Sequence, residues 1–229
     1  MAESLLLERF GSAALVTLNR PEKRNALSIE LRRALAEALD RLAQDATVAA
    51  VGLTGAGSAF CAGMDVTQFG GDRAHKQQLV DSSVASFGTL ARFPKPTVAL
   101  VNGPAIAGGF ALALLCDLRV AGPDARFGFP ELGRYIPPSY AAAAAALAPA
   151  VARDLCLTGR MLDAREALEL GVVSRISAGR EALDQVAAAP AAATAEVKRR
   201  ILLHGGGAGW LELMNDEERA LRAALLGEQ

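Results

Sequence analysis

The sequence of 229 residues lacks an excess of charge of either sign. Its 24 lysines and arginines against 25 aspartates and glutamates give a formal net charge of −1. Proteins that bind nucleic acid neutralise many phosphates with basic residues, so this composition argues against a nucleic-acid partner. Aromatic residues are also scarce, at 5%, although 52% of the chain is hydrophobic, because much of that fraction is alanine. The length suffices for the buried core of an enzyme-sized domain.

Long uninterrupted hydrophobic runs are missing as well. The one stretch close to the roughly 20 residues that a bilayer requires is 97–116, and polar or helix-breaking residues interrupt it at Asn102, Gly103, Pro104, Gly108 and Gly109. We expect a strand, a turn and a buried helix there, and no membrane partner. The first residues include Glu3 and Glu8 and no basic segment, which is untypical of a signal peptide.

Cysteine is rare and widely spaced. Cys61, Cys116 and Cys156 form no CxxC pair, so the sequence predicts no zinc or other metal site. An odd number of distant cysteines suits reduced thiols, and we therefore expect a cytoplasmic protein.

Apolar runs and glycines predict an α/β fold. Residues 5–18 hold two short apolar runs around Gly11 and Ser12, which predicts a β-hairpin. Ser28 precedes a helical pattern, and its hydroxyl is placed to cap the first turn. Further strands are expected over 48–54 and 97–101, and helices over 74–92, from about 107, and in a helix-rich region from about 139. Strand, glycine-rich loop and helix occur twice in similar order, which indicates repeating ββα units.

Two glycine-rich loops, 55–63 and 102–109, each follow a predicted buried strand and lead into a predicted helix. Unpaired backbone N–H groups at such positions, together with the helix dipole, favour negative charge. Two donors that face one point form an oxyanion hole, whereas tight turns that serve only the fold are the alternative. Neither loop has a Walker or GxGxxG spacing, so a phosphate or dinucleotide site is not supported.

Several motifs occur in an order that is informative as a set. They are NRPEKRNAL (19–27), GSAFCAGMDV (57–66), KPTVALVNGPAIAGG (95–109), CDLR (116–119), FGFPE (127–131), LTGR (157–160) and the segment 164–173. Together they resemble the enoyl-CoA hydratase/isomerase (crotonase) superfamily over roughly residues 5–176. The resemblance favours an oxyanion hole over simple turns.

The resemblance implies a crotonase-like spiral of ββα units over 1–188 and a C-terminal helical oligomerisation segment over 189–229. Such segments typically support a homotrimer or a dimer of trimers. It also implies an acyl-CoA substrate, with coenzyme A entering only as part of that substrate and no separate cofactor.

The resemblance also assigns binding roles by motif position. The oxyanion donors would be the backbone N–H groups of Met64 and Gly108, and a backbone donor tolerates methionine where a small residue is commoner. Contacts with the coenzyme A part would come from Arg24, Ala26, Ala62, Met64, Asp65, Val66 and Gly108. Lys23 and Arg24 either add charge near the phosphates or form a solvated surface pair.

The acid and base groups separate the possible reactions. Family hydratases place two glutamates beside the substrate, and this chain keeps only the second, Glu131, with Ala111 at the position of the first. A methyl group cannot activate water, whereas one carboxylate suffices to move a proton between two carbons of an acyl chain. The resemblance thus favours an enoyl-CoA isomerase with Glu131 as the catalytic base. Phe127, Phe129 and Pro130 are expected to desolvate Glu131 and raise its pKa; without the motif, a surface or helix-entry role would be the simpler interpretation.

The segment after Glu131 departs from the family. The segment 132–140 is about one residue shorter than usual and lacks the Gly-Gly-Thr sequence of the family. We therefore expect the wall of the acyl pocket to differ from that of close family members. Tyr135, Ser139 and Tyr140 offer polar groups there, although we expect core packing with a bonded hydroxyl for each. Asp117 is expected to stabilise the fold locally, and Trp210 with 211–226 to form a packed or intersubunit helix.

Other functions stay open. A hydratase that recruits a second polar group fits the same motifs, and so does thioester hydrolysis or decarboxylation at the same oxyanion hole. A catalytically weak CoA-binding or assembly protein is the alternative from another class, because of Ala111 and the altered wall. His75 and His204 lack the partners of a Ser-His-Asp set, and no GxSxG occurs, so serine hydrolysis is not expected.

Overall fold

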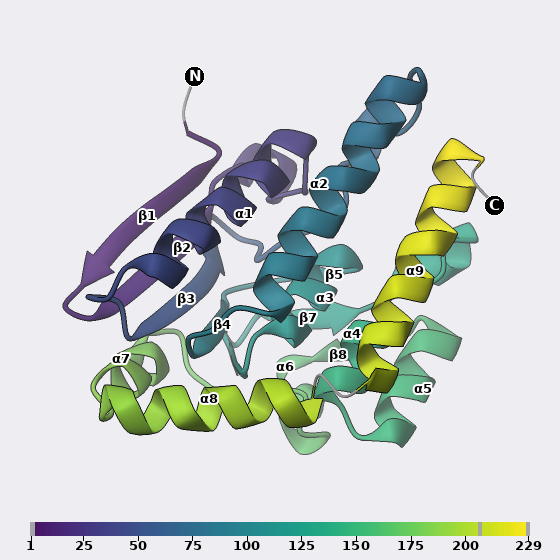
Figure 1. The fold of residues 1–229 in the computed structure, drawn as a ribbon. Coiled ribbons are helices and arrows are strands. Elements are labelled where there is room, and N and C mark those ends of the chain that lie inside the picture. The colour runs from purple at the N-terminus through teal and green to yellow at the C-terminus, as the bar shows by residue number, and fades with distance from the viewer. Residues whose placement is uncertain (1–2, 206–207, 228–229) are drawn as a thin grey trace.

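Two β-sheets with helices packed around them make up the part of the chain that the computed structural model describes, residues 3–205 and 208–227 (Figure 1). The larger sheet has the strand order β1-β2-β3-β4-β6-β9, and the smaller one β5-β7-β8. The strands of the larger sheet are β1 (Leu5–Phe10), β2 (Ala13–Leu18), β3 (Ala50–Gly55), β4 (Thr97–Val101), β6 (Leu118–Ala121) and β9 (Arg175–Ile176). Those of the smaller sheet are β5 (Ala105–Ile106), β7 (Arg126–Gly128) and β8 (Met161–Asp163).

The predicted hairpin over 5–18 is confirmed. β1 and β2 pair antiparallel, with Leu5 opposite Leu18, and Gly11 makes the turn at φ +60°, a backbone conformation that glycine adopts without steric cost. The remaining strands of the larger sheet are parallel to their neighbours. Parallel neighbours need crossover connections, and these connections contain the helices and the glycine-rich loops.

The helices follow the expected positions closely. Ser28 caps α1 (Ile29–Gln44) by accepting a hydrogen bond from the N–H of Leu31 at 3.2 Å. The other helices are α2 (Arg73–Ala91), α3 (Gly108–Leu115), α4 (Tyr140–Ala146), α5 (Pro149–Thr158), α6 (Ala164–Glu169), α7 (Glu181–Ala187), α8 (Ala191–Gly205) and α9 (Ala208–Leu226). Short 3-10 helices occupy Pro21–Lys23, Val66–Gln68 and Pro130–Arg134.

The apolar stretch 97–116 contains the predicted strand (β4), turn and buried helix (α3), together with a short strand, β5, that was not predicted. Helix α3 is buried on nearly all sides, and the ring of its Phe110 lies 5.5 Å from that of Phe127 and 4.9 Å from that of Phe129. Helices that are hydrophobic all round belong in a protein core. Within residues 3–205 and 208–227, no helix is both long and apolar enough to cross a membrane.

The C-terminal helices pack against the rest of the chain through buried polar contacts. Lys198 of α8 is 3% exposed and donates to both carboxylate oxygens of Asp117, at 2.7 and 2.8 Å. Asp117 also accepts from the N–H and hydroxyl of Thr97, so its expected local role is observed and extends to α8. Helix α9 lies along α2 and α4 (Figure 1); the side chain of Trp210 lies outside the described residues.

Candidate active site

The two glycine-rich loops approach each other so closely that side chains are excluded between them. The N–H of Ile106 donates to the carbonyl of Cys61 at 2.9 Å, in a parallel bridge between Cys61 and Ala105. A Cβ atom on Gly109 would lie 2.2 Å from that carbonyl oxygen, and one on Gly63 would lie 2.9 Å from the Cβ of Ala107. Only glycine permits this approach, which places the turn before α3 directly against the loop 61–64.

The backbone around Met64 leaves its N–H group free. The N–H of Leu27 donates to the carbonyl of Gly63 at 2.8 Å, and the N–H of Asp65 donates to the carbonyl of Leu27 at 3.3 Å. Successive residues of an extended segment direct their backbone groups to opposite sides, so the N–H of Met64 points away from Leu27. It donates no hydrogen bond within the described part of the chain.

Gly108 begins α3 beside Met64. Ala107 precedes it with φ +53°, a rare conformation for a residue with a side chain and one often found at functional sites. The N–H of Gly108 stands at the first helical position and donates to no described residue. A Cβ atom on Gly108 would lie 3.8 Å from the Cγ of Met64. Gly108 and the side chain of Met64 are therefore neighbours, and the N–H groups of both residues donate no hydrogen bond within the described part of the chain.

The predicted coenzyme A contacts cluster on the segments next to Met64. The N–H of Ala62 donates to the carbonyl of Arg24 at 3.0 Å, and the Arg24 side chain is exposed. Arg20 joins the two segments, because its guanidinium bonds the carbonyl of Ala26 at 2.6 Å and the carboxylate of Asp65 at 2.9 Å. Val66 is 56% exposed beside them, and Lys23 is exposed as well.

Two asparagines, Asn25 and Asn102, fix the first glycine-rich loop, a role that was not predicted from the sequence. Asn25 is fully buried and donates to the carbonyls of Ala56 and Ala59 at 2.9 and 2.8 Å. Asn102 donates to the carbonyl of Gly57 at 2.9 Å. Such amide groups satisfy loop carbonyls that have no sheet partner. Both asparagines lie within the motifs 19–27 and 95–109, and this position was the one feature of the sequence that could have predicted their role.

Glu131 lies in the 3-10 helix that follows β7. Burial raises the pKa of its carboxyl to about 7, and a backbone hydrogen bond opposes the rise only in part. Its Oε2 atom is buried and has no hydrogen-bond partner among the described residues. The expected desolvation is therefore observed. Phe129, two residues before Glu131, is fully buried, and its ring packs at a tilt against that of Phe110 from α3.

Ala111 lies in the first turn of α3 and is 1% exposed. Its N–H donates to the carbonyl of Ala107 at 3.0 Å, and its methyl group packs in the hydrophobic core. The position that the resemblance assigns to the first glutamate of family hydratases thus contributes no polar group here.

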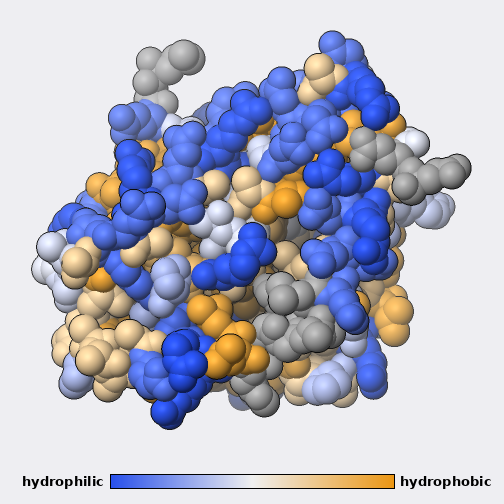
Figure 2. Space-filling model, in the orientation of Figure 1, coloured by the Kyte–Doolittle hydropathy of each residue, from blue (hydrophilic) through white to orange (hydrophobic). Residues whose placement is uncertain are grey.

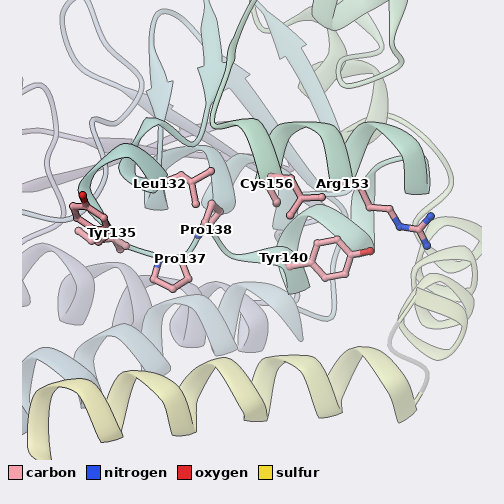
Figure 3. A pocket seen from close by; sticks show the side chains of 9 residues that line it. Leu132, Tyr135, Pro137, Pro138, Tyr140, Arg153 and Cys156 are labelled. Atoms are coloured by element: carbon pink, nitrogen blue, oxygen red, sulfur yellow. The ribbon is translucent and has the colours of Figure 1, made fainter.

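An apolar pocket of about 730 Å³ is lined in part by Leu132, the residue that follows Glu131. Figure 3 shows Tyr135 at one end and Tyr140 with Arg153 at the other. The thiol of Cys156 lines it; burial raises the pKa of that thiol to about 11, and the charges of Glu217 and Glu131 contribute to the rise. The pocket therefore lies within electrostatic reach of Glu131.

The expectation of core packing is wrong for Tyr135, which is 98% exposed with φ +61°. The 3-10 helix ends at this residue in a left-handed turn, which directs the ring outward. Ser139 instead caps α4 and donates to the carboxylate of Glu217 from α9 at 2.7 Å. Tyr140 is partly buried on the pocket wall.

Comparison with known proteins identifies the family. The enoyl-CoA hydratase/isomerase family model matches residues 8–202. The chain belongs to this family, the crotonase superfamily, and is an enzyme of that superfamily.

Individual relatives carry hydratase names. A Thermus thermophilus protein provisionally named an enoyl-CoA hydratase is 44% identical over 186 residues, which cover 78% of this chain and 73% of the relative. Enoyl-CoA hydratase EchA19 of Mycobacterium tuberculosis is 40% identical over 78% of this chain and 70% of its own. The crystal structure of an enoyl-CoA hydratase from Mycobacterium avium subsp. paratuberculosis superposes with a TM-score of 0.87 at 25% identity, over 100% of this chain and 96% of that one.

Proposed function

We propose that the enzyme isomerises an enoyl-CoA, moving the double bond from C3 to C2 through an enolate. The N–H groups of Met64 and Gly108 bind the thioester oxygen as negative charge develops on it. Preorganised backbone donors of this kind stabilise such oxyanions strongly, and losing one costs about 3 kcal/mol in tested enzymes. The neighbouring positions and free N–H groups of the two residues support this role.

Glu131 moves the proton. Its carboxylate removes a proton from C2, the electron pair delocalises onto the thioester oxygen, and the same carboxyl returns the proton to C4. A base works best when its pKa lies near the working pH. The observation that carries the proposal is the half-buried Glu131 carboxyl, whose pKa is about 7 and whose Oε2 has no hydrogen-bond partner among the described residues. One group suffices, because no water enters the product.

The coenzyme A part of the substrate binds mainly through backbone groups of 24–26 and 62–66. The Arg20–Asp65 ion pair supports this assignment, because it holds these two segments together. Arg24 is free to approach a phosphate from the surface. Coenzyme A is part of the substrate in this proposal, and no separate cofactor is invoked.

Hydration is the second candidate, and the hydratase names of the relatives favour it. Addition of water across C2 and C3 requires a group that orients and deprotonates the water besides the acid that protonates C2. Ala111 cannot supply that group, so a hydratase of this sequence needs another polar side chain, and Tyr140, which lines the pocket, is one candidate.

A panel of acyl-CoA thioesters with product identification tests the proposal. We expect a 3-enoyl-CoA to give the 2-enoyl isomer, with little 3-hydroxyacyl-CoA from a 2-enoyl-CoA. A 3-hydroxyacyl-CoA as the dominant product would establish the hydratase instead. Absence of turnover together with calorimetric binding of coenzyme A would indicate a binding or assembly protein.

We also propose that the protein assembles as a homotrimer or a dimer of trimers. Helix α8 exposes Val197, Ile201 and Leu203, at 55%, 45% and 66%. In Figure 2, pale orange surface lies over α7 and the start of α8, and an orange patch lies further along α8 beyond a blue, hydrophilic group. Exposed apolar surface of this kind is typical of subunit contacts. Light scattering after size exclusion tests it; a monomer at micromolar concentration would contradict it.

A further inference from the structure

Arg32 of α1 is the most enclosed charged side chain of the described residues. It is 0% exposed. Its Nε donates to the carbonyl of Ser28 at 3.3 Å, and its Nη1 donates to the Sδ of Met64 at 3.4 Å. Its Nη2 is buried and finds no hydrogen-bond partner among the described residues. A thioether is a weak acceptor, so this cation is poorly compensated.

No described carboxylate forms a salt bridge with Arg32. The two that act on its charge are Glu30 and Asp65; Asp65 bonds Arg20 at 2.9 Å, and Glu30 is exposed and accepts from Gln68. Burial lowers the pKa of Arg32 to about 10, which leaves the guanidinium charged at neutral pH. Proteins seldom retain an unpaired buried charge without a use for it, because its desolvation is costly.

The place of this charge suggests the use. Met64 joins the guanidinium to the loop that carries one proposed oxyanion donor, and the Cγ of Met64 lies against Gly108, which carries the other. Because Arg32 is enclosed, a substrate in the site does not touch it. Arg32 therefore acts on the thioester through the electric field of its guanidinium and by fixing the side chain of Met64.

We propose that Arg32 is a positioning residue that strengthens the oxyanion site. It holds the side chain of Met64 in place and puts a buried positive charge next to Met64. The inference rests on the oxyanion site of the proposed function but not on Glu131 or on isomerisation. As a general scale, a unit charge within about 8 Å of a developing oxyanion, at an effective dielectric constant of about 20, changes a rate by about tenfold or more.

The test uses a chromophoric arylacryloyl-CoA, whose absorption shifts to longer wavelength when its thioester carbonyl is polarised. We compare the bound spectrum in the wild type with Arg32→Met, Arg32→Gln and Arg32→Lys. The matched control is Arg33→Met, which removes the same charge from the next residue of α1, whose side chain is exposed. Thermal unfolding of each variant is recorded in parallel.

We expect Arg32→Met and Arg32→Gln to lose at least half of the red shift and about tenfold in turnover, without a lower unfolding temperature. Arg32→Lys and Arg33→Met should keep most of the red shift and most of the turnover. An unchanged red shift in either uncharged variant would overturn the proposal, as would a wild type that shows no shift. Should the enzyme prove a hydratase while the red shift still depends on Arg32, only the isomerase proposal fails.

Discussion

The protonation state of Glu131 links its burial to its chemistry. Burial disfavours the charged carboxylate and raises the pKa to about 7. The charged form is the one that abstracts a proton, so the fraction of enzyme with an active base increases as the pH rises through that pKa. Near neutrality both forms are populated, which suits a group that must take up a proton and then return it.

The pH dependence of turnover follows directly. We expect kcat/KM for a 3-enoyl-CoA to rise with pH and to level off above about pH 7, because the free enzyme must hold Glu131 deprotonated. Initial rates between pH 5 and 9 measure this rise of kcat/KM with pH. A rate already at its plateau at pH 5.5 would show that the essential carboxyl has an ordinary pKa.

Glu131 also makes stability depend on pH. Its folded pKa of about 7 lies above the ordinary 4.5, so the folded state binds the proton more tightly, and stability falls as pH rises from about 4.5 to 7. Glu131→Gln removes this loss. We expect the variant to gain on the order of 1–2 kcal/mol at pH 8 and nothing at pH 4.5 in urea unfolding.

A matched control is Glu37→Gln on the exposed face of α1. Surface substitutions of this kind change stability by about 0.5 kcal/mol or less. Equal gains for Glu37→Gln and Glu131→Gln at pH 8 would contradict the buried-carboxyl account.

At single residues, sequence reasoning succeeded where a local pattern existed. Phenylalanines and proline before Glu131 predicted its desolvation. Arg32 was missed, although it stands three residues from Ile29 and from Leu35 in the apolar stripe of α1, a spacing that places it on the buried face. Its contact with Met64 arises from tertiary packing and has no local signal.

Among the elements, the close contact of the two loops depends on glycine. Gly109→Ala would put a Cβ atom 2.2 Å from the carbonyl oxygen of Cys61 and force α3 away from the loop of Met64. We expect a loss of about 2 kcal/mol in stability, as for overpacking in a core, and at least tenfold in turnover. Denaturant unfolding and initial rates measure both.

Gly133→Ala is the control for that substitution. A Cβ atom on Gly133 meets nothing within 4 Å, so we expect its unfolding free energy to stay within about 0.5 kcal/mol of the wild type. If Gly109→Ala is equally harmless, the loops are not held together as described.

The element boundaries were largely predictable. Apolar periodicity and the cap at Ser28 located the hairpin, β4 and α1 to α3 within about two residues. The exposure of Tyr135 was not predicted, because an aromatic residue in an apolar segment favours burial, whereas the left-handed turn that ends the 3-10 helix directs it outward.

For the whole molecule, the buried Lys198–Asp117 pair connects α8 to the sheet. Among the described residues, Lys198→Met leaves the Asp117 carboxylate with the N–H and hydroxyl of Thr97 as its hydrogen-bond partners. Removing one member of a buried pair costs about 3 kcal/mol, and we expect a loss of that order in urea unfolding. Arg199→Met, on the exposed side of α8, should change stability by less than about 1 kcal/mol.

The motifs predicted the overall fold because they are ordered as in a known family. They could not show how the C-terminal helices pack, since helices of similar composition fit several faces. Lys198 and Glu217 determine that packing here, through Asp117 and the N-terminus of α4. The division at residue 188 stays a prediction.

The central claim is that Glu131 carries the proton between C2 and C4 of an enoyl-CoA. The most direct measurement is the rate of isomerisation of a 3-enoyl-CoA at pH 8 by the wild type and by Glu131→Gln, with both folded. We predict that the amide variant loses at least a thousandfold in kcat and still binds the substrate. Isomerisation at the wild-type rate by Glu131→Gln would contradict the account.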